Sequence, residues 1–308
     1  MRAFRTQIRV PHPIPYQGSK RAIAGEILRY FPRRVLRLVE PFAGSAAISI
    51  AAAAYGKAER FWINDINAPL MHLWQTILHD PERIAEDYRN LWEEQAGRER
   101  AYYDLIRQKF NQTHRPDYLL YLLARCVKAS VRYNANGEFN QSPDKRRRGM
   151  HPATMRRHLL NASRLLSGRT LVTAWHYRDV LDKVCSDDLV YMDPPYQGVC
   201  RGRDPRYYTD IDHEEFIDWL YKLNSQGVAY LLSYDGHNDL RQYGRPLPDD
   251  LKLTRVEIHA GRSSQATLLG IEAYTVESLY LSPALVATLD NLPEAPVRQQ
   301  QYILFEAS

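Results

Sequence analysis

Leu36–Asn67 reads LRLVEPFAGSAAISIAAAAYGKAERFWINDIN, and this stretch decides the fold class. Leu36–Glu40 is a short apolar run closed by a proline, which predicts a buried strand. Ala46–Tyr55 is rich in Ala and Ile without a helix breaker, which predicts a helix that begins at the preceding Gly-Ser turn. Phe61–Ile63 predicts a second strand. Strand, glycine turn, helix and strand in this order indicate an α/β fold with a parallel sheet.

The same pattern resumes after a long interruption. Between residues 69 and 128, apolar side chains recur at spacings of three and four, which predicts helices. A basic segment, Arg132–Gly149, and another helical stretch, Pro152–Leu166, complete the interruption. Elsewhere the sequence predicts helices at 19–31 and 213–223, strands at 171–174, 188–191 and 228–233, and β-rich runs at 251–259 and 273–281.

The composition is that of an ordinary globular protein. Of the 308 residues, 44% are hydrophobic, 25% charged and 11% aromatic, which excludes wholesale disorder and collagen-like structure. No run approaches the roughly 18 apolar residues that span a bilayer, and the first residues lack the apolar core of a signal peptide. The three cysteines have no metal-ligand spacing. We therefore expect a cytoplasmic protein with no membrane partner and no metal site.

Positive charge is concentrated in the interrupting segment. Between Ala124 and Arg169 there are eleven Lys and Arg against two acidic residues, so this segment carries +9 and the rest of the chain −4. One basic block on a slightly acidic body indicates a polyanionic partner. A solvated surface loop is the alternative explanation for such a block.

The strongest chemical motif is Asp193-Pro194-Pro195-Tyr196, which directly follows a predicted strand. The prolines stiffen the backbone, so the Asp193 carboxylate and the Pro194 carbonyl form a preset pair of acceptors. Such a pair can accept both N–H groups of an exocyclic amine, and Tyr196 offers a ring on which a planar base can stack. A rigid turn after a strand is the alternative.

A second motif combines Glu40-Pro41-Phe42-Ala43-Gly44 with Asp65. Small residues at a strand-to-helix turn let a ligand approach the backbone closely, and Asp65 at the end of the next strand is placed to accept two ribose hydroxyls. A single glycine instead of three disfavours a dinucleotide. A plain tight turn is the alternative.

A third motif is Tyr16-Gln17-Gly18-Ser19-Lys20, a Gly-Ser turn that opens a predicted helix beside a lysine. Backbone N–H groups and an ammonium suit a carboxylate ligand. Alone this motif is also typical of an ordinary helix cap.

Together the three motifs resemble the Dam-like (alpha-group) S-adenosylmethionine-dependent DNA adenine-N6 methyltransferases. The order along the chain is the same, and the interruption carries Arg132-Tyr133-Asn134 and Gly137-Glu138-Phe139-Asn140, which look like the RYN and GEFN motifs of that family. The resemblance spans about residues 14 to 280. It implies a Rossmann-like methyltransferase domain at 1–75 and 165–283, an inserted, mainly helical DNA-recognition domain at 76–164, and a tail at 284–308.

The resemblance also implies roles for individual residues. The catalytic residues are Asp193, Pro194, Pro195 and Tyr196. The residues that bind S-adenosyl-L-methionine are Tyr16, Gly18, Lys20, Glu40, Pro41, Phe42, Gly44, Asp65, His176, Tyr177 and Asp193, with Tyr16 and Lys20 at the methionine end. The residues that bind double-stranded DNA are Arg132, Tyr133, Asn134, Asn140, Lys145, Arg146, Arg147 and Arg148.

The expected reaction is direct in-line transfer to an adenine that is flipped out of the duplex. Cytosine-C5 methylation needs a cysteine nucleophile that typically follows a proline, and no cysteine in the chain does so. Two alternatives stay open: a methyltransferase acting on RNA or protein, and a catalytically silent DNA-binding relative. The resemblance further implies a nucleoid-associated enzyme, with a cognate restriction endonuclease or other defence-system subunits as candidate partners.

Overall fold

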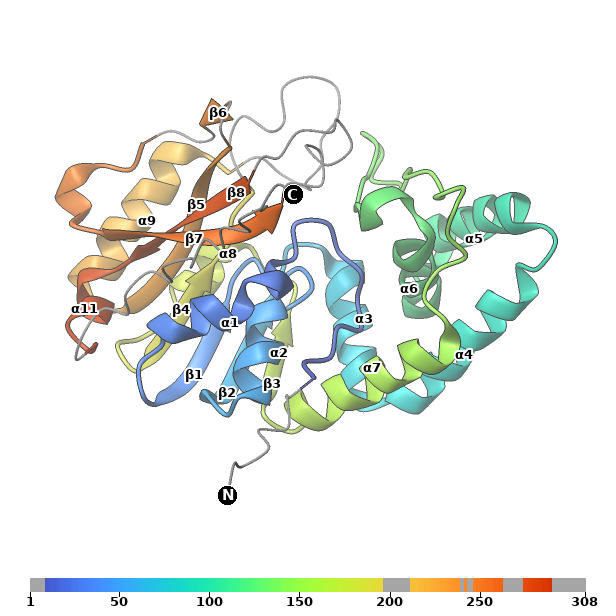
Figure 1. Cartoon of the computed structure of the whole chain (residues 1–308), viewed down its shortest axis with the longest axis horizontal. Coiled ribbons are helices and arrows are strands. Elements are labelled where there is room, and N and C mark those ends of the chain that lie inside the picture. Colours follow the sequence, from blue (N-terminus) through green and yellow to red (C-terminus); the bar gives the residue numbers. More distant parts are fainter. Residues whose placement is uncertain (1–8, 196–210, 239–240, 243–245, 263–273, 290–308) are drawn as a thin grey trace, which may run out of the picture.

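The computed structural model describes residues 9–195, 211–238, 241–242, 246–262 and 274–289 (Figure 1). A mixed sheet forms its centre, with strands in the order β3-β2-β1-β4-β5-β8-β7 and β6 paired to β5. The strands are β1 (Val35–Glu40), β2 (Ala58–Asn64), β3 (Thr170–Thr173), β4 (Asp188–Met192), β5 (Ala229–Asn238), β6 (Arg241–Gln242), β7 (Thr254–Arg262) and β8 (Tyr274–Leu281).

The strands β1 to β5 are parallel, and β7 and β8 are antiparallel additions beside β5. From β1 the chain builds outward to β2 and β3 on one side, and it later returns to place β4 and β5 on the other. The neighbours β1 and β4 therefore mark the point where the strand order reverses. Open α/β sheets bind their ligands at the carboxyl ends of strands at such a point. The sequence prediction of an α/β fold with a parallel sheet is confirmed.

Helices cover both faces of the sheet (Figure 1). Leu189 and Tyr191 of β4 face a cluster with α1 (Ala24–Ile27) and α2 (Ala47–Ala54), whereas the alternate residues Val190 and Met192 face α8 (Tyr177–Leu181) and α9 (His213–Ser225). All five residues of β4 are buried, as expected for a parallel strand covered on both faces. The described C-terminal end holds α11 (Pro283–Val286).

Five α-helices occur in the segment between β2 and β3, and they lie beside the sheet (Figure 1). Their apolar faces join the same continuous core as α2 and the strands. Asp80 caps α4 by accepting a hydrogen bond from the Arg83 N–H, and a proline follows at its first position. The helices are α3 (Ala68–His79), α4 (Pro81–Glu94), α5 (Glu99–Thr113), α6 (Pro116–Arg125) and α7 (Pro152–Leu166).

The helix predicted at 19–31 is broken into three short pieces. They are η1 (Lys20–Ala22), α1 and η2 (Leu28–Tyr30), and two further 3₁₀ turns are η3 (Val127–Ala129) and η4 (Asp249–Leu251). The apolar side chains of this segment are buried against α2, so tertiary packing rather than a continuous hydrogen-bond ladder holds it. None of the described helices is long and apolar enough to cross a membrane.

Candidate active site

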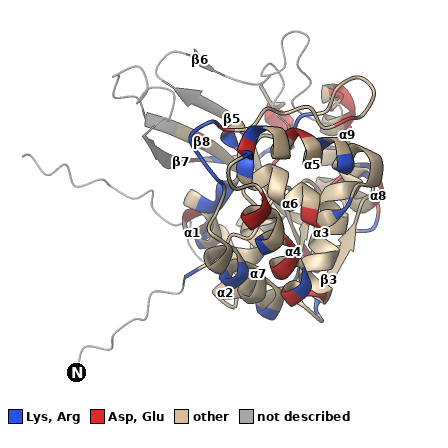
Figure 2. Cartoon of the chain, turned by 90° about the vertical axis from the view of Figure 1, so that its right-hand side faces the viewer, with Lys and Arg blue, Asp and Glu red and all other residues tan. Residues whose placement is uncertain are grey.

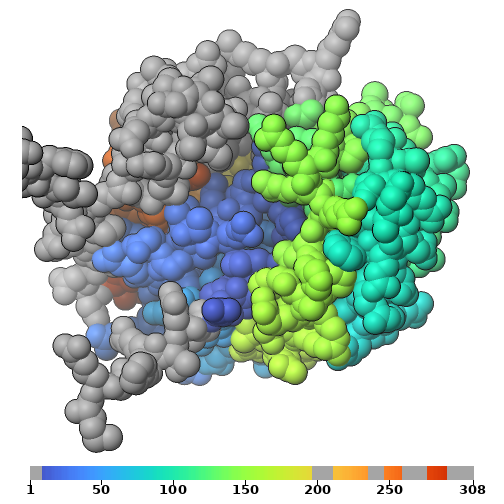
Figure 3. Space-filling model, turned by 45° about the vertical axis from the view of Figure 1, so that its right-hand side comes forward, coloured from blue at the N-terminus to red at the C-terminus, as the bar shows by residue number. Residues whose placement is uncertain are grey.

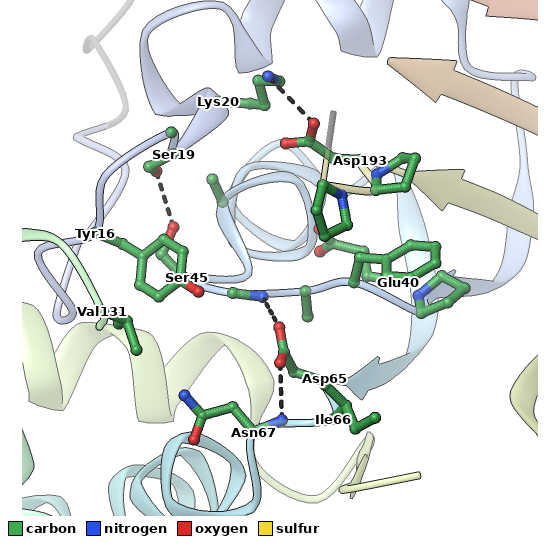
Figure 4. A pocket seen from close by; sticks show the side chains of 18 of the residues that line it. Tyr16, Ser19, Lys20, Glu40, Ser45, Asp65, Ile66, Asn67, Val131 and Asp193 are labelled. Carbon is green, nitrogen blue, oxygen red and sulfur yellow. Dashed lines mark hydrogen bonds and ion pairs between the residues drawn. The ribbon is translucent and has the colours of Figure 1, made fainter. Parts of the chain in front are cut away.

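One pocket lies at the carboxyl ends of β1, β2 and β4 (Figure 4). The space inside it, counted out to its solvent-facing mouth, is about 1180 Å³. The lining includes all the cofactor residues predicted from the sequence: Tyr16, Gly18, Lys20, Glu40, Pro41, Phe42, Gly44, Asp65, His176, Tyr177 and Asp193. Pro194 and Pro195 also line it, whereas Tyr196 lies outside the described residues.

The Asp65 carboxylate fixes the turn that follows β1. One of its oxygens accepts a hydrogen bond from the Gly44 N–H at 3.0 Å, and the other accepts from the Asn67 N–H at 3.0 Å. Burial raises the pKa of Asp65, and these two backbone donors act in the opposite direction. Asp65 therefore joins the loop after β1 to the loop after β2 beneath the pocket (Figure 4).

Gly44 adopts a conformation that favours glycine. Its φ is +50°, its carbonyl accepts a hydrogen bond from Trp74 Nε1 at 3.0 Å, and an added Cβ would lie 3.0 Å from Cε1 of Tyr16. The Tyr16 ring thus packs directly on the turn, and both residues line the pocket. A side chain at position 44 would meet strain from the backbone and crowding from Tyr16 together.

The sequence predicts that Gly44 binds S-adenosyl-L-methionine. On that prediction we expect Gly44→Ala to weaken cofactor binding by about tenfold or more, because crowding displaces the Tyr16 ring and positive φ strains an alanine by about 1–2 kcal/mol. Calorimetry with S-adenosylhomocysteine measures the affinity. Gly56→Ala is a matched control, since Gly56 also has positive φ, at +64°, but no atom lies within 4 Å of an added Cβ. Equal losses of affinity in the two variants would show that the contact with Tyr16 is unimportant.

Glu40 is a buried carboxyl group at the end of β1. It is 2% exposed, and its Oε1 accepts a hydrogen bond from the Ser49 N–H, in the first turn of α2, at 2.6 Å. Burial raises the pKa of Glu40 to about 7, and the nearby charge of Asp193 acts in the same direction. Glu40 satisfies a helix N–H that has no partner within its helix, so it ties β1 to α2.

Lys20, in the motif Tyr16–Lys20, contacts Asp193 of the Asp193–Tyr196 motif. Its Nζ lies 3.2 Å from Oδ1 of Asp193 and 3.1 Å from Oε2 of Glu277, and the residue is 7% exposed. The loop before Lys20 is held by a hydrogen bond from Ser45 Oγ to Ser19 Oγ, at 2.8 Å. The sequence predicted Lys20 and Asp193 in one site but did not predict Glu277, which lies on β8 far along the chain.

Asn64 is a further residue that sequence reasoning missed. Its side chain is fully buried, donates to the carbonyls of Pro41 and Trp175 at 3.0 Å each, and accepts from Thr173 Oγ1 at 2.7 Å and from the Trp175 N–H at 2.9 Å. It therefore fastens the loops after β1 and β3 to the end of β2. Its position directly before Asp65 was the only signal in the sequence.

Aromatic side chains line one wall of the pocket. The rings of Phe42 and Tyr177 lie 5.2 Å apart, and the rings of His176 and Tyr177 lie 4.6 Å apart. His176 Nδ1 accepts a hydrogen bond from Arg178 Nε at 3.1 Å, and burial is the main cause that lowers the pKa of His176. This wall therefore offers ring faces for an aromatic ligand.

The predicted DNA-binding residues fall into two groups along the chain. The first comprises Arg132, Tyr133, Asn134 and Asn140, and the second comprises Lys145–Arg148. Tyr133 is 9% exposed and lines the pocket, with its hydroxyl donating to Asn67 Oδ1 at 3.3 Å. Asn134 stabilises its own loop, because its Oδ1 accepts from the N–H groups of Asn136 and Glu138, both at 2.9 Å. Arg132 is half-buried and Asn140 is exposed. Figure 3 shows N-terminal residues (blue) beside residues of the interrupting segment (yellow-green) on one face of the molecule.

The side chains of Lys145, Arg146, Arg147 and Arg148 are all exposed. On the side of the molecule shown in Figure 2, Lys and Arg positions (blue) are interspersed with Asp and Glu positions (red). The backbone of the Lys145–Arg148 loop is anchored, because the Arg148 carbonyl accepts from Gln95 Nε2 at 3.0 Å. Arg148 is also ion-paired with Glu99 at 2.7 Å, and Arg147 lies 3.7 Å from Asp144. Within the described part of the chain, no metal-binding group of three or more His, Cys, Asp or Glu residues occurs.

Comparisons with known proteins agree on one family. The family model of the D12 class N6 adenine-specific DNA methyltransferases matches residues 16–256. The chain is 31% identical over 263 residues to the retron Ec67 DNA adenine methylase of Escherichia coli, covering 82% of this chain and 88% of that protein. It is 28% identical over 187 residues to the DNA adenine methylase of Serratia marcescens, covering 59% and 66%.

A more distant relative, the type II methyltransferase M.MjaIII of Methanocaldococcus jannaschii, is 24% identical over 242 residues, covering 71% of this chain and 82% of that protein. The family model spans all three motifs that the sequence singled out, and the pocket brings these motifs together. The resemblance inferred from the motifs is confirmed, and so is the adenine-specific DNA methyltransferase activity it implied. The chain belongs to the D12 class of N6 adenine-specific DNA methyltransferases.

Proposed function

We propose that this pocket binds S-adenosylmethionine and that Asp193 receives an adenine flipped out of duplex DNA beside it. The observation that carries the proposal is the meeting of Asp193, Lys20 and the Asp65–Gly44 turn in one pocket at the switch point of the sheet. Family membership gives the reaction, and the pocket geometry supports these positions for its two substrates.

The lining fits the three parts of S-adenosylmethionine. The ring faces of Phe42 and Tyr177 suit its adenine, and the Asp65 carboxylate, besides its two backbone donors, has lone pairs for ribose hydroxyls. The Tyr16 ring packs on the Gly44 turn, and Figure 4 shows Tyr16 on the same side of the pocket as Ser19, where we place the methionine end. The positions of Gly18, Glu40 and Pro41 on the lining support the same placement.

Asp193 and the Pro194 carbonyl would accept the two N6–H bonds of adenine, which favours a pyramidal nitrogen whose lone pair points into the pocket. S-adenosylmethionine, when bound, supplies a sulfonium methyl group: the N–C bond forms as the S–C bond breaks, the electron pair stays on sulfur, and one N6 proton passes to solvent. The contribution of the protein is positioning and electrostatic stabilisation of charge on N6. Stacking of Tyr196 on the flipped base stays a prediction.

We further propose that residues 76–164 form the DNA-recognition segment of this Rossmann-like enzyme, inserted between catalytic parts at 1–75 and 165–283. Helices α4 to α6, most of α7 and the basic loop that holds Lys145–Arg148 lie within it. Arg132, Tyr133, Asn134 and Asn140 remain candidates for contacts to bases, whereas Lys145–Arg148 suit phosphates, which need charge without fixed geometry. With the ring of Tyr133 buried, its contact with DNA would require movement of the loop.

Replacing Lys145 and Arg146 together by glutamine should weaken binding to duplex DNA of any sequence. Each lost phosphate contact reduces the slope of log affinity against log salt by about 0.9, so the slope should fall by about 2. Fluorescence anisotropy at several salt concentrations measures both quantities.

The matched control is the double variant Arg29→Gln with Arg34→Gln, which removes the same charge outside residues 76–164. Both arginines are exposed and ion-paired, to Glu26 and Glu59. We expect the control to keep the wild-type salt slope, and an equal fall in both double variants would contradict a local role of the basic loop.

Mass spectrometry of nucleosides tests the proposed function. The protein is incubated with methyl-labelled S-adenosylmethionine and, separately, duplex DNA, RNA of the same sequence, and a bacterial protein extract. We expect label only in DNA and only in N6-methyladenine. Label confined to RNA or protein would overturn the proposal, and cofactor binding without any transfer would favour a catalytically silent relative.

Partners follow from the DNA substrate. Relatives include the modification methylase StsI of Streptococcus sanguinis and the type II methyltransferase M.FokI of Planomicrobium okeanokoites. On this basis we propose a defence context, with a cognate restriction endonuclease or other defence-system subunits as partners, and action on DNA in the nucleoid of the cytoplasm.

A further inference from the structure

Glu277 lies close to the catalytic motif although no sequence motif contains it. It belongs to β8, which pairs with β5, and β5 in turn pairs with β4, the strand that ends directly before Asp193. Because β5 separates them, β4 and β8 lie about 10 Å apart in the sheet. The Lys20 ammonium fills this interval, with contacts of 3.2 Å to Asp193 and 3.1 Å to Glu277.

A register shift in β5 accompanies this arrangement. The pairing of β5 with β8 is irregular between Ser233 and Gly236, and Gly236 is the residue opposite Glu277. Such bulges often occur beside active sites, where they redirect a side chain. The pairing of β5 is therefore irregular at the position opposite Glu277, the residue that contacts Lys20.

The charges of the three groups do not cancel. Lys20 is 7% exposed, and a buried ammonium requires an anionic partner, which Asp193 alone could supply. Glu277 adds a second negative charge beside the Lys20 ammonium. In the transition state positive charge develops on the adenine N6 beside Asp193, so an extra negative charge at this distance stabilises the reacting geometry.

We propose that Glu277 is a positioning residue for methyl transfer, which acts through Lys20 to orient Asp193 and to keep its carboxylate a strong acceptor. The inference rests on the proposed function of the pocket. Without Glu277, the positive charge of Lys20 would act more strongly on Asp193, whose carboxylate would then accept the N6–H bond more weakly.

The test compares Glu277→Gln with the wild type in steady-state methylation of duplex DNA. We expect kcat to fall about 10- to 100-fold, while KM for cofactor and for DNA stays within about threefold, because misplacement of a catalytic group acts on the chemical step. Glu277→Asp keeps the charge and should recover part of the lost kcat. The control is Glu257→Gln, on the neighbouring strand β7, where the exposed Glu257 is ion-paired with Arg255 at 3.5 Å.

The pH profile of kcat separates positioning from a merely structural role. Among the described residues, the charged or titratable groups around Asp193 include Lys20, Glu277, Glu40 and Tyr191. Removal of the negative charge of Glu277 strengthens the pull of Lys20 on Asp193, so the acid limb should move to lower pH. The readout is the difference between the pH profiles of variant and wild type.

Unchanged kcat and an unchanged acid limb in Glu277→Gln would overturn the proposal, even if the melting temperature falls. If Glu277→Gln does not fold, Glu277→Asp carries the test: a loss of kcat of about 3- to 10-fold at constant KM supports the proposal, and wild-type kcat overturns it. Absence of transfer by the wild-type protein would instead refute the proposed function, so the two failures are distinguishable.

Discussion

Replacing Asp193 by alanine should lower the rate of methyl transfer by about a thousandfold or more, because a preorganised acceptor at developing charge commonly contributes this much. The variant should still fold, since Lys20 keeps Glu277 as a partner at 3.1 Å. Single-turnover transfer from labelled cofactor to duplex DNA measures the rate.

Two further variants sharpen this prediction. Asp193→Asn keeps the shape and one acceptor oxygen but loses the charge, and we expect it to remain at least about a hundredfold slower than the wild type. Asp218→Asn makes the same change at an exposed position of α9 and should leave the rate unaltered. If Asp193→Asn kept more than about a tenth of the wild-type rate, the carboxylate would not be the acceptor that the transition state requires.

Replacing Asp65 by alanine should weaken cofactor binding by about a hundredfold, equivalent to about 2.7 kcal/mol. The variant loses the acceptor proposed for the ribose and leaves the N–H groups of Gly44 and Asn67 without the carboxylate that now accepts from both, at 3.0 Å each. Hydrogen bonds to a charged acceptor are the strong ones, so the turn after β1 should loosen as well. Calorimetry with S-adenosylhomocysteine measures the affinity.

Asp65→Asn should not rescue binding, because its amide NH₂ would face one of the two backbone donors. Glu59→Ala is the control on β2, the strand that ends directly before Asp65. The exposed carboxylate of Glu59 is ion-paired with Arg34 at 2.9 Å. We expect the control to bind cofactor like the wild type. Wild-type affinity in Asp65→Ala would refute the proposed ribose contact.

The sequence predicted the parallel half of the sheet and the gathering of the three motifs, because both depend on local rules. A strand, a glycine turn and a helix follow one another from Leu36 to Tyr55, and parallel strands bring their carboxyl ends to one edge of the sheet. Asp65 and Gly44 could therefore be placed together before their hydrogen bond at 3.0 Å was known.

Contacts that depend on long-range pairing could not be predicted. Glu277 meets Lys20 only because β8 lies beside β5, and the β-rich runs at the end of the sequence do not reveal which strand they join. The network of Asn64 requires β3 to lie against β2 across the whole interrupting segment. The burial of Tyr133 likewise follows from packing against Phe139 and from its bond to Asn67, which no local pattern encodes.

A crystal structure of the protein with sinefungin, an unreactive analogue of S-adenosylmethionine, tests the account most directly. It should show the purine against Phe42 and Tyr177, the ribose hydroxyls on Asp65, and the amine that replaces the sulfonium methyl facing Asp193. Sinefungin bound outside this pocket, or bound within it with its ribose away from Asp65 and its amine away from Asp193, would contradict the account.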